Sequence, residues 1–220
     1  MNEPPDRERD KRKDTAADRR SPTLPTAPAN PQGKGQVGFL VDWHYSTPRG
    51  VVAKSRHGIL ADYFTSLLVL SAAFKFKPVY GKPYYLYWRG ERWELSLLAP
   101  GDWRDAGRQD AFAGTCVLHD DTTWSIDPSE NLRRPGPVAD AVASLYGGFV
   151  DKLASERPLE DELPWYEGSL PYYQRIFAAA LSRSLKASLG KGTQLNLPSS
   201  SWLAELPRDA GRLLGHHGTD

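Results

Sequence analysis

The feature that most constrains the fold is the segment YYLYWRGERWELSLL, residues 84–98. Apolar and polar side chains alternate on both sides of Gly90-Glu91, which is typical of two strands joined by a two-residue turn. Glycine at the first turn position favours a type II′ turn. Counting back from the turn predicts the cross-strand pairs Arg89–Arg92, Trp88–Trp93, Leu86–Leu95 and Tyr84–Leu97.

The predicted register divides this hairpin into two faces. The apolar face is expected to be buried and consists of Tyr84, Leu86, Trp88, Trp93, Leu95 and Leu97. The polar face consists of Tyr85, Tyr87, Arg89, Arg92, Glu94 and Ser96. A slip of one residue would mix the two sets, so the pattern fixes the register. We interpret Trp88 and Trp93 as a cross-strand core pair rather than a stacking surface. Tyr85 and Tyr87, beside arginines, are candidates for a ligand platform.

A second hairpin is predicted directly after the first, with strands at residues 112–119 and 122–126 joined by Asp120-Asp121. Cys116 and His119 have C-x-x-H spacing, but side chains three apart in a strand point to opposite faces. We therefore expect no shared metal site, and we expect Cys116 to be a small buried residue. His119 is either a candidate acid–base group beside two aspartates or an ordinary polar residue flanking a turn.

Helical patterns surround the two hairpins. Residues 60–76 are apolar around most of the circumference, which predicts a buried helix packed against the sheet and ended by Pro78. A second helix is predicted from Pro137, with an interruption at Gly147-Gly148, and a third from Ser169 to Gly190. The predicted fold is therefore α+β. It has a small antiparallel β-meander of about four strands at residues 79–127, packed against a short apolar helix, with a C-terminal helical part at residues 137–190.

Length and composition set outer limits on the class of protein. A chain of 220 residues that is 40% hydrophobic can build one domain with a substantial core. The single cysteine excludes an internal disulfide and a cysteine-based zinc site. A formal net charge of +1 argues against nucleic-acid binding by bulk electrostatics. No apolar run is long enough to span a membrane and no signal sequence is recognisable, so we expect a cytoplasmic protein without a membrane partner.

Both ends of the chain are predicted to be disordered. Residues 1–36 mix eight basic and six acidic side chains and then become rich in proline, which provides little apolar surface for folding. The alternative for this tail is a basic arm for RNA, DNA or an acidic lipid surface. Residues 208–220 contain three glycines and two histidines and are predicted to fray. A single domain at residues 37–207 remains.

The search for catalytic motifs returns none. The segment SLGKGT, which ends at Thr193, lacks the first glycine of a P-loop, and Gly192 stands where a serine or threonine would be needed. We therefore expect no cofactor and no metal. Asp42 and His44 form a sequence-adjacent carboxylate–imidazole pair, which is a common acid–base combination. The candidate ligand or partner contacts are Asp42, His44, Tyr85, Tyr87, Trp103, His119 and Asp121.

One stretch, at residues 76–127, carries a pattern of glycines, aromatic residues and an Asp-x-Thr-Trp motif. Its members are Gly81, Tyr85, Leu86, Tyr87, Gly90, Ser96, Pro100, Trp103, Phe112, Leu118, Asp121, Thr123 and Trp124, with His44 and Gly50 as a weaker upstream match. This pattern resembles the family named domain of unknown function 2452. The chain departs from the family at Arg104, where the family has glycine, and in the short apolar helix that replaces a long polar one. The resemblance implies no activity, cofactor or catalytic residue.

Because the strongest pattern is structural, the sequence favours a non-enzymatic binding or protein-interaction domain, with another protein as the partner class. The alternative is a small-molecule-binding protein or enzyme that uses a His/Asp/Tyr surface pocket. Convergence of His44 and Asp121 with Tyr85 or Tyr87 in one pocket would favour that alternative. A third hypothesis is weak binding of RNA or single-stranded DNA through the tail and the polar hairpin face, although nucleic acid is not the expected partner.

Overall fold

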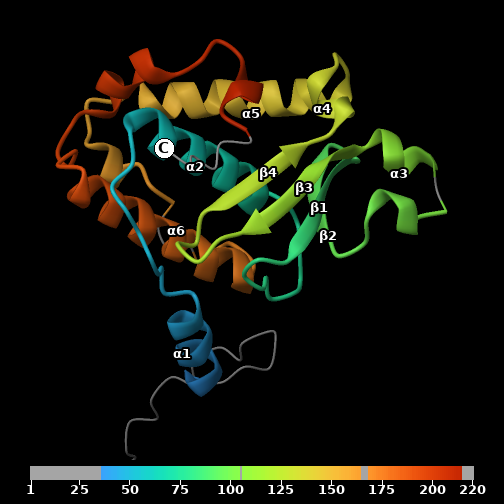
Figure 1. The fold of residues 1–220 in the computed structure, drawn as a ribbon, viewed down its shortest axis with the longest axis horizontal. Helices are drawn as coiled ribbons and strands as arrows, with labels where there is room; N and C mark the ends of the chain where they lie inside the picture. The colour runs from blue at the N-terminus through green and yellow to red at the C-terminus, as the bar shows by residue number, and fades with distance from the viewer. Residues whose placement is uncertain (1–35, 105, 165–167, 215–220) are drawn as a thin grey trace, which may run out of the picture. The chain divides into compact units, whose positions relative to one another are not determined.

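The computed structural model describes residues 36–104, 106–164 and 168–214 (Figure 1). The predicted α+β class is confirmed. The helices are α1 (Gln36–Tyr45), α2 (Arg56–Leu70), α3 (Ala106–Asp110), α4 (Glu130–Arg133), α5 (Pro137–Leu153) and α6 (Tyr172–Lys191). The strands are β1 (Pro83–Arg89), β2 (Arg92–Ser96), β3 (Phe112–Leu118) and β4 (Trp124–Pro128). Short 3₁₀ helices are η1 (Pro100–Asp102), η2 (Leu159–Asp161), η3 (Ser199–Glu205) and η4 (Ala210–Arg212).

The four strands form one antiparallel sheet in the order β2-β1-β3-β4. Within the β1–β2 hairpin the predicted register is confirmed, with Leu86 opposite Leu95 and Trp88 opposite Trp93. The sheet is not a simple meander, because β3 pairs with β1 rather than with β2. The other side of β2 is already bonded to Ala73, and the chain after β2 passes through η1 and α3 to reach the free side of β1.

The turn between β1 and β2 differs from the predicted type II′. Gly90 and Glu91 both have positive φ angles, of 53° and 60°, which is the conformation of a type I′ turn. The twist of this turn also suits a tight hairpin, so the register is unchanged. Two residues of the predicted apolar face are also less buried than predicted. Leu97 lies beyond the end of β2 and is 61% exposed, and Trp88 is only half-buried against Trp93.

One face of the sheet packs against α2, which in turn packs against α5 and α6 (Figure 1). The largest fully buried side chains come from all of these layers and include Tyr63, Phe64, Leu86, Trp124, Phe149, Phe177 and Trp202. Cys116 is buried, as predicted. Gly114 of β3 is required for close packing, because a Cβ there would lie 2.5 Å from the carbonyl oxygen of Asp127 on β4.

The helix bounds differ from the predicted ones where local contacts intervene. α2 begins at Arg56, because the Ser55 hydroxyl accepts a hydrogen bond from the N–H of Gly58. It ends at Leu70 rather than at residue 76, and the chain then extends along β2 at Ala73. α5 continues through the two glycines that were predicted to interrupt it. α6 begins at Tyr172 after Pro171 and ends at Lys191.

The prediction of disorder can be compared with the structure at the C-terminal end only. Residues 1–35 lie outside the described residues, and Gln36 begins α1. The predicted disorder from residue 208 is wrong as far as Leu214, because η4 forms there and both Leu213 and Leu214 are buried. These two leucines supply apolar surface that the neighbouring glycines and histidines lack. Residues 215–220 lie outside the described part of the chain.

Candidate functional site

The sequence-predicted site residues do not gather in one place. Asp42 and His44 lie on α1, but Asp42 is 4% exposed and His44 is exposed, as expected for helix positions two apart. The Asp42 carboxylate accepts hydrogen bonds from the Lys77 ammonium and the Tyr172 hydroxyl, both at 2.9 Å. Asp42 therefore anchors α1 to the start of α6 and to the loop before β1, and it does not pair with His44 as an acid–base couple.

The two tyrosines of the predicted ligand platform have different surroundings. Tyr87 is fully buried, contrary to the expectation that it lies on an open polar face. Its ring packs on Phe112, its hydroxyl donates to the carbonyl of Leu98 at 2.9 Å, and burial raises the pKa of that hydroxyl. Tyr85 is half-buried. Trp103, after η1, is also half-buried, and the Arg108 guanidinium lies 3.4 Å from the centre of its ring.

Asp121 belongs to a cluster that fastens the β3–β4 turn to α2. The Lys54 ammonium donates to Asp121 at 2.8 Å and also contacts Asp62 of α2. Burial alone would raise the pKa of Asp121, but hydrogen bonds from Lys54 and Thr123 outweigh it and lower that pKa. Burial alone would lower the pKa of Lys54, but its two carboxylate partners, Asp62 and Asp121, outweigh this effect and raise that pKa. The cluster is thus an ion-paired structural clamp.

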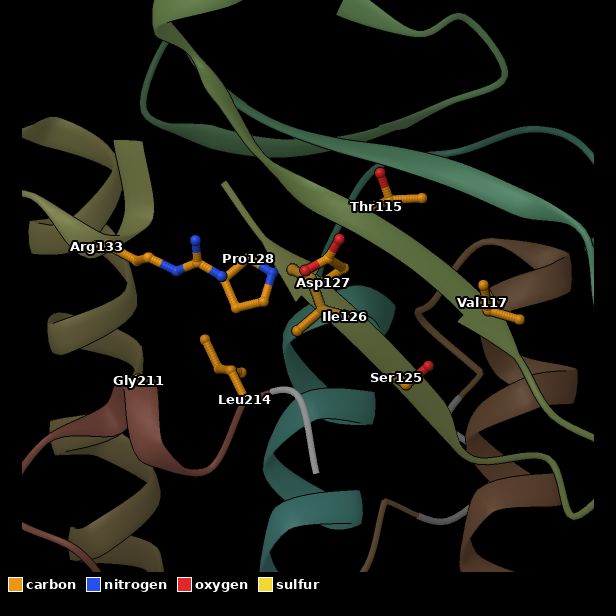
Figure 2. A pocket seen from close by; sticks show the side chains of 9 residues that line it. All are labelled: Thr115, Val117, Ser125, Ile126, Asp127, Pro128, Arg133, Gly211 and Leu214. Carbon is orange, nitrogen blue, oxygen red and sulfur yellow. The ribbon is translucent and has the colours of Figure 1, made fainter. Parts of the chain in front are cut away.

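His119 lies at the end of the sheet nearest this clamp. Its Nε2 atom is 2.7 Å from the hydroxyl oxygen of Ser125 on β4. Ser125 also lines a groove that the sequence did not reveal (Figure 2). His119 therefore does not line the groove itself, but it contacts Ser125, which does. His44, Asp121 and the tyrosines do not converge in one pocket among the described residues.

The groove has a volume of about 610 Å³ and runs along β4, the last strand of the sheet. Side chains of β3 and β4 form one part of its lining, and the end of α4 and the segment around η4 form the rest (Figure 2). The lining residues are Thr115, Val117, Ser125, Ile126, Asp127, Pro128, Arg133, Gly211 and Leu214. The lining therefore combines apolar surface with hydroxyl groups and charged groups of both signs.

The outward-facing backbone groups of β4 are buried rather than open to this groove. His119 donates its N–H to Thr123, and Ser129 donates its N–H to Ala113, so the odd-numbered residues of β4 face β3. The alternation directs the N–H groups of Trp124 and Ile126 away from β3. The hydroxyl of Ser66 accepts the Trp124 N–H at 2.9 Å, which agrees with this direction. No described group bonds the N–H or C=O of Ile126, but the whole residue is only 1% exposed, so these groups do not face solvent.

Of the two charged side chains that line the groove, Arg133 is in an ion pair and Asp127 is not, among the described residues. The Arg133 guanidinium is 3.2 Å from the carboxylate of Glu130, to which Arg134 also binds. Asp127 is exposed on the solvent-facing side of β4 and makes no ion pair with any described residue. A carboxylate in contact with water needs no partner for stability, so Asp127 remains available to a ligand.

No family model, curated protein or solved structure matches the chain. The resemblance over residues 76–127 therefore stays a prediction. Within the described ranges, no set of three potential metal ligands comes together, and none of the helices is long and apolar enough to cross a membrane.

Sequence reasoning missed the groove for identifiable reasons. Asp127 and Pro128, at the end of the second hairpin, are residue types that favour an edge strand over a central one. That signal was present in the sequence. Arg133, Gly211 and Leu214 carry no local signal, because they reach the groove only through the packing of α4 and η4 beside β4.

Proposed function

We propose that this protein is a non-enzymatic interaction domain that binds an extended peptide segment of a partner protein in the groove along β4. The observation that carries the proposal is the groove itself, of about 610 Å³, whose lining combines apolar surface, hydroxyl groups and the exposed carboxylate of Asp127. In such a groove apolar contacts supply affinity and polar contacts supply specificity.

The outer edge of β4 is closed to a partner strand, so the side chains of the groove would make the contacts. At one end of that edge the Trp124 N–H is bonded to Ser66, and at the other end Pro128 has no N–H to donate. Ile126, between them, is 1% exposed, so its backbone groups are covered. The segment around Gly211 and Leu214 walls one side of the groove.

The alternative of a small-molecule site or an enzyme has weaker support. It was expected to require His44 and Asp121 beside one of the tyrosines, but none of these residues lines the groove, and Asp121 is paired with Lys54. Nucleic-acid binding through the hairpin also has weaker support, since Tyr87 is buried and Arg92 is paired with Glu94 at 3.1 Å. The family resemblance adds no activity to either alternative.

Chemical-shift changes measured by NMR test the proposal at single residues. Peptides are first selected on the full chain from a random eight-residue library displayed on phage, and the selected sequences are synthesised. Saturating peptide is expected to shift the resonances of Ser125 and Asp127, because both residues line the groove. The amide of Leu95 on β2 is the matched control, because it is covered by Ala73, to which it donates at 3.2 Å.

Three outcomes would overturn the proposal. The library could yield no binding peptide, or selected peptides could leave the resonances of Ser125 and Asp127 unchanged. These resonances could instead shift with rising protein concentration and no peptide, with a dimer in analytical ultracentrifugation. That third result would assign the groove to a second copy of the chain.

A further inference from the structure

The chain between α1 and α2 contains a second surface, at residues 50–53 (Figure 1). We infer that this 50–53 segment binds an acidic extended segment of a partner protein as an added strand. Gly50, with a φ of 64°, turns the chain into the segment, and the Ser55 cap of α2 follows it. None of its residues lines the groove at β4, so this second site does not depend on the groove.

One side of the 50–53 segment is held by α6 and the residues after it. The Ser188 hydroxyl donates to the carbonyl of Val52 at 2.7 Å, and the side-chain amide of Gln194 donates to the carbonyl of Lys54 at 3.3 Å. Carbonyls two residues apart therefore point to the same side, which is the geometry of a strand. These bonds hold the segment extended before a partner arrives, which lowers the cost of ordering it on binding.

The other side of the segment carries open backbone groups. In an extended chain the N–H and C=O of Val51 and Ala53 point away from those of Val52. No described group bonds the N–H or C=O of Val51 or Ala53. Ala53 is exposed and Val51 is partly exposed, and unbonded backbone groups at such positions bond water. Two residues at this spacing offer two donors and two acceptors to an added strand.

The side chain of Val52 supplies an apolar contact to the same partner. It is 58% exposed, although valine is a residue type that is usually buried. A partner residue directly opposite Val52 on an added strand would have its Cβ about 5 Å away. An apolar side chain at that position would remove surface of both residues from water. The expected recognition element therefore includes an apolar residue.

The charge around the segment favours an acidic partner. Residues 49–57 contain no acidic side chain, and Arg49 and Arg56 flank the segment. Lys191 lies one turn beyond the serine of α6 that bonds the segment. None of these three cations forms an ion pair with a described residue. Even with the exposed Asp120 and the ion-paired clamp counted, positive charge is in excess, which is complementary to carboxylates.

Selection on two variants tests this inference. The random eight-residue phage library is selected on the full wild-type chain, on Ala53→Pro and on Val52→Asp. Ala53→Pro removes an N–H that has no described partner, Val52→Asp changes an exposed side chain, and circular dichroism checks both folds. Wild type is expected to enrich a class with aspartate or glutamate beside an apolar residue, and both variants should lose it. Val79→Asp, at another exposed valine, is the matched control and should retain the class.

A synthetic peptide of this class provides the quantitative readout. Its Kd should rise about 2- to 13-fold on Ala53→Pro, the effect of one backbone hydrogen bond. It should rise about 1.5- to 5-fold on Arg49→Gln, the effect of one exposed ion pair, and this second effect should shrink at high salt. Saturating peptide should slow amide exchange at Val51 and Ala53 and leave the Val52 amide unchanged, because that N–H points towards α6. This alternation is specific to strand addition.

The inference is overturned if no selected class depends on both Ala53 and Val52, or if that class is not enriched in acidic residues. It is also overturned if a bound peptide slows exchange at all three amides equally, as docking without strand pairing would. Protection of Val51 and Ala53 that rises with protein concentration, without peptide and with a dimer in analytical ultracentrifugation, would instead assign the segment to a second copy of the chain. The resonances of the groove residues report the proposed function separately, so failure of one proposal is distinguishable from failure of the other.

Discussion

The two edges of the sheet are protected in different ways. On β2, the main chain of Ala73 donates to Trp93 at 2.8 Å and accepts from Leu95 at 3.2 Å, so the edge is covered by the chain that leaves α2. On β4, one side-chain hydroxyl takes the first outward N–H and a proline ends the strand. The first edge is covered by main-chain hydrogen bonds, whereas the second is short and covered by packing that leaves Trp124 and Ile126 each 1% exposed.

This difference teaches that a sheet edge can be protected without a paired strand. Unpaired edges invite association, and natural proteins limit it by covering the edge, shortening it or placing proline and charge on it. The β2 edge is covered by main-chain pairing, which contributes to stability of the domain. The β4 edge is limited by Ser66, Pro128 and Asp127 and by the burial of Ile126.

The largest expected effect comes from removing the anchor that holds β4 on the core. Trp124 is fully buried on the inner side of β4. Trp124→Ala should lower the free energy of unfolding by about 3–5 kcal/mol, because it removes buried apolar surface and leaves a cavity. Chemical denaturation measures the change. Leu97→Ala, at an exposed residue after β2, should change it by less than about 0.5 kcal/mol. Equal losses in the two variants would contradict the packing described for β4.

A smaller effect is expected at the turn that begins β4. Asp121→Asn removes the charge that binds Lys54 and should cost about 1.5–3 kcal/mol at neutral pH. Because the folded state lowers the pKa of Asp121, its contribution should be complete above about pH 5 and decline as the pH falls below about 4. Urea denaturation of wild type and variant at several pH values measures this.

The neighbouring aspartate provides the control for that prediction. Asp120 is exposed in the same turn, and only its backbone carbonyl is bonded, by the N–H of Arg49. Asp120→Asn should therefore leave stability unchanged across the same pH range. A pH-independent difference between wild type and Asp121→Asn would show that the carboxylate charge does not hold the turn.

The smallest effect is expected on opening the β2 edge. Ala73→Pro removes the N–H that donates to Trp93 and should cost about 0.5–1.5 kcal/mol, the value of one backbone hydrogen bond. Exchange of the Leu95 amide, which donates to the carbonyl of the same residue, should become faster as the contact with Ala73 loosens. Ala73→Ser retains the N–H and the exposed position, and it should match wild type. Unchanged Leu95 exchange in the proline variant would mean that Ala73 does not protect this edge.

The sequence predicted the local elements of the sheet better than it predicted the site. Alternation around Gly90-Glu91 was sufficient for the β1–β2 register, because each residue's face depends only on its distance from the turn. The surroundings of each face were not predictable in the same way. Tyr87 follows the polar alternation, yet it is buried because Phe112 and the chain around Leu98 cover it. His44 and Asp121 were paired as candidates by residue type, and the fold holds them in different contacts.

By itself, the sequence determined the α+β class, the strands of both hairpins, the burial of Cys116 and the starting region of each long helix. These features follow from periodicity and turn residues, which act over a few positions. Only the tertiary structure decided the strand order, the covered β2 edge and the groove at β4. Those depend on contacts between residues far apart in the chain, such as Ser66 with Trp124 and the packing of Leu214 beside Ile126. No local pattern encodes which distant segment will lie at a strand edge.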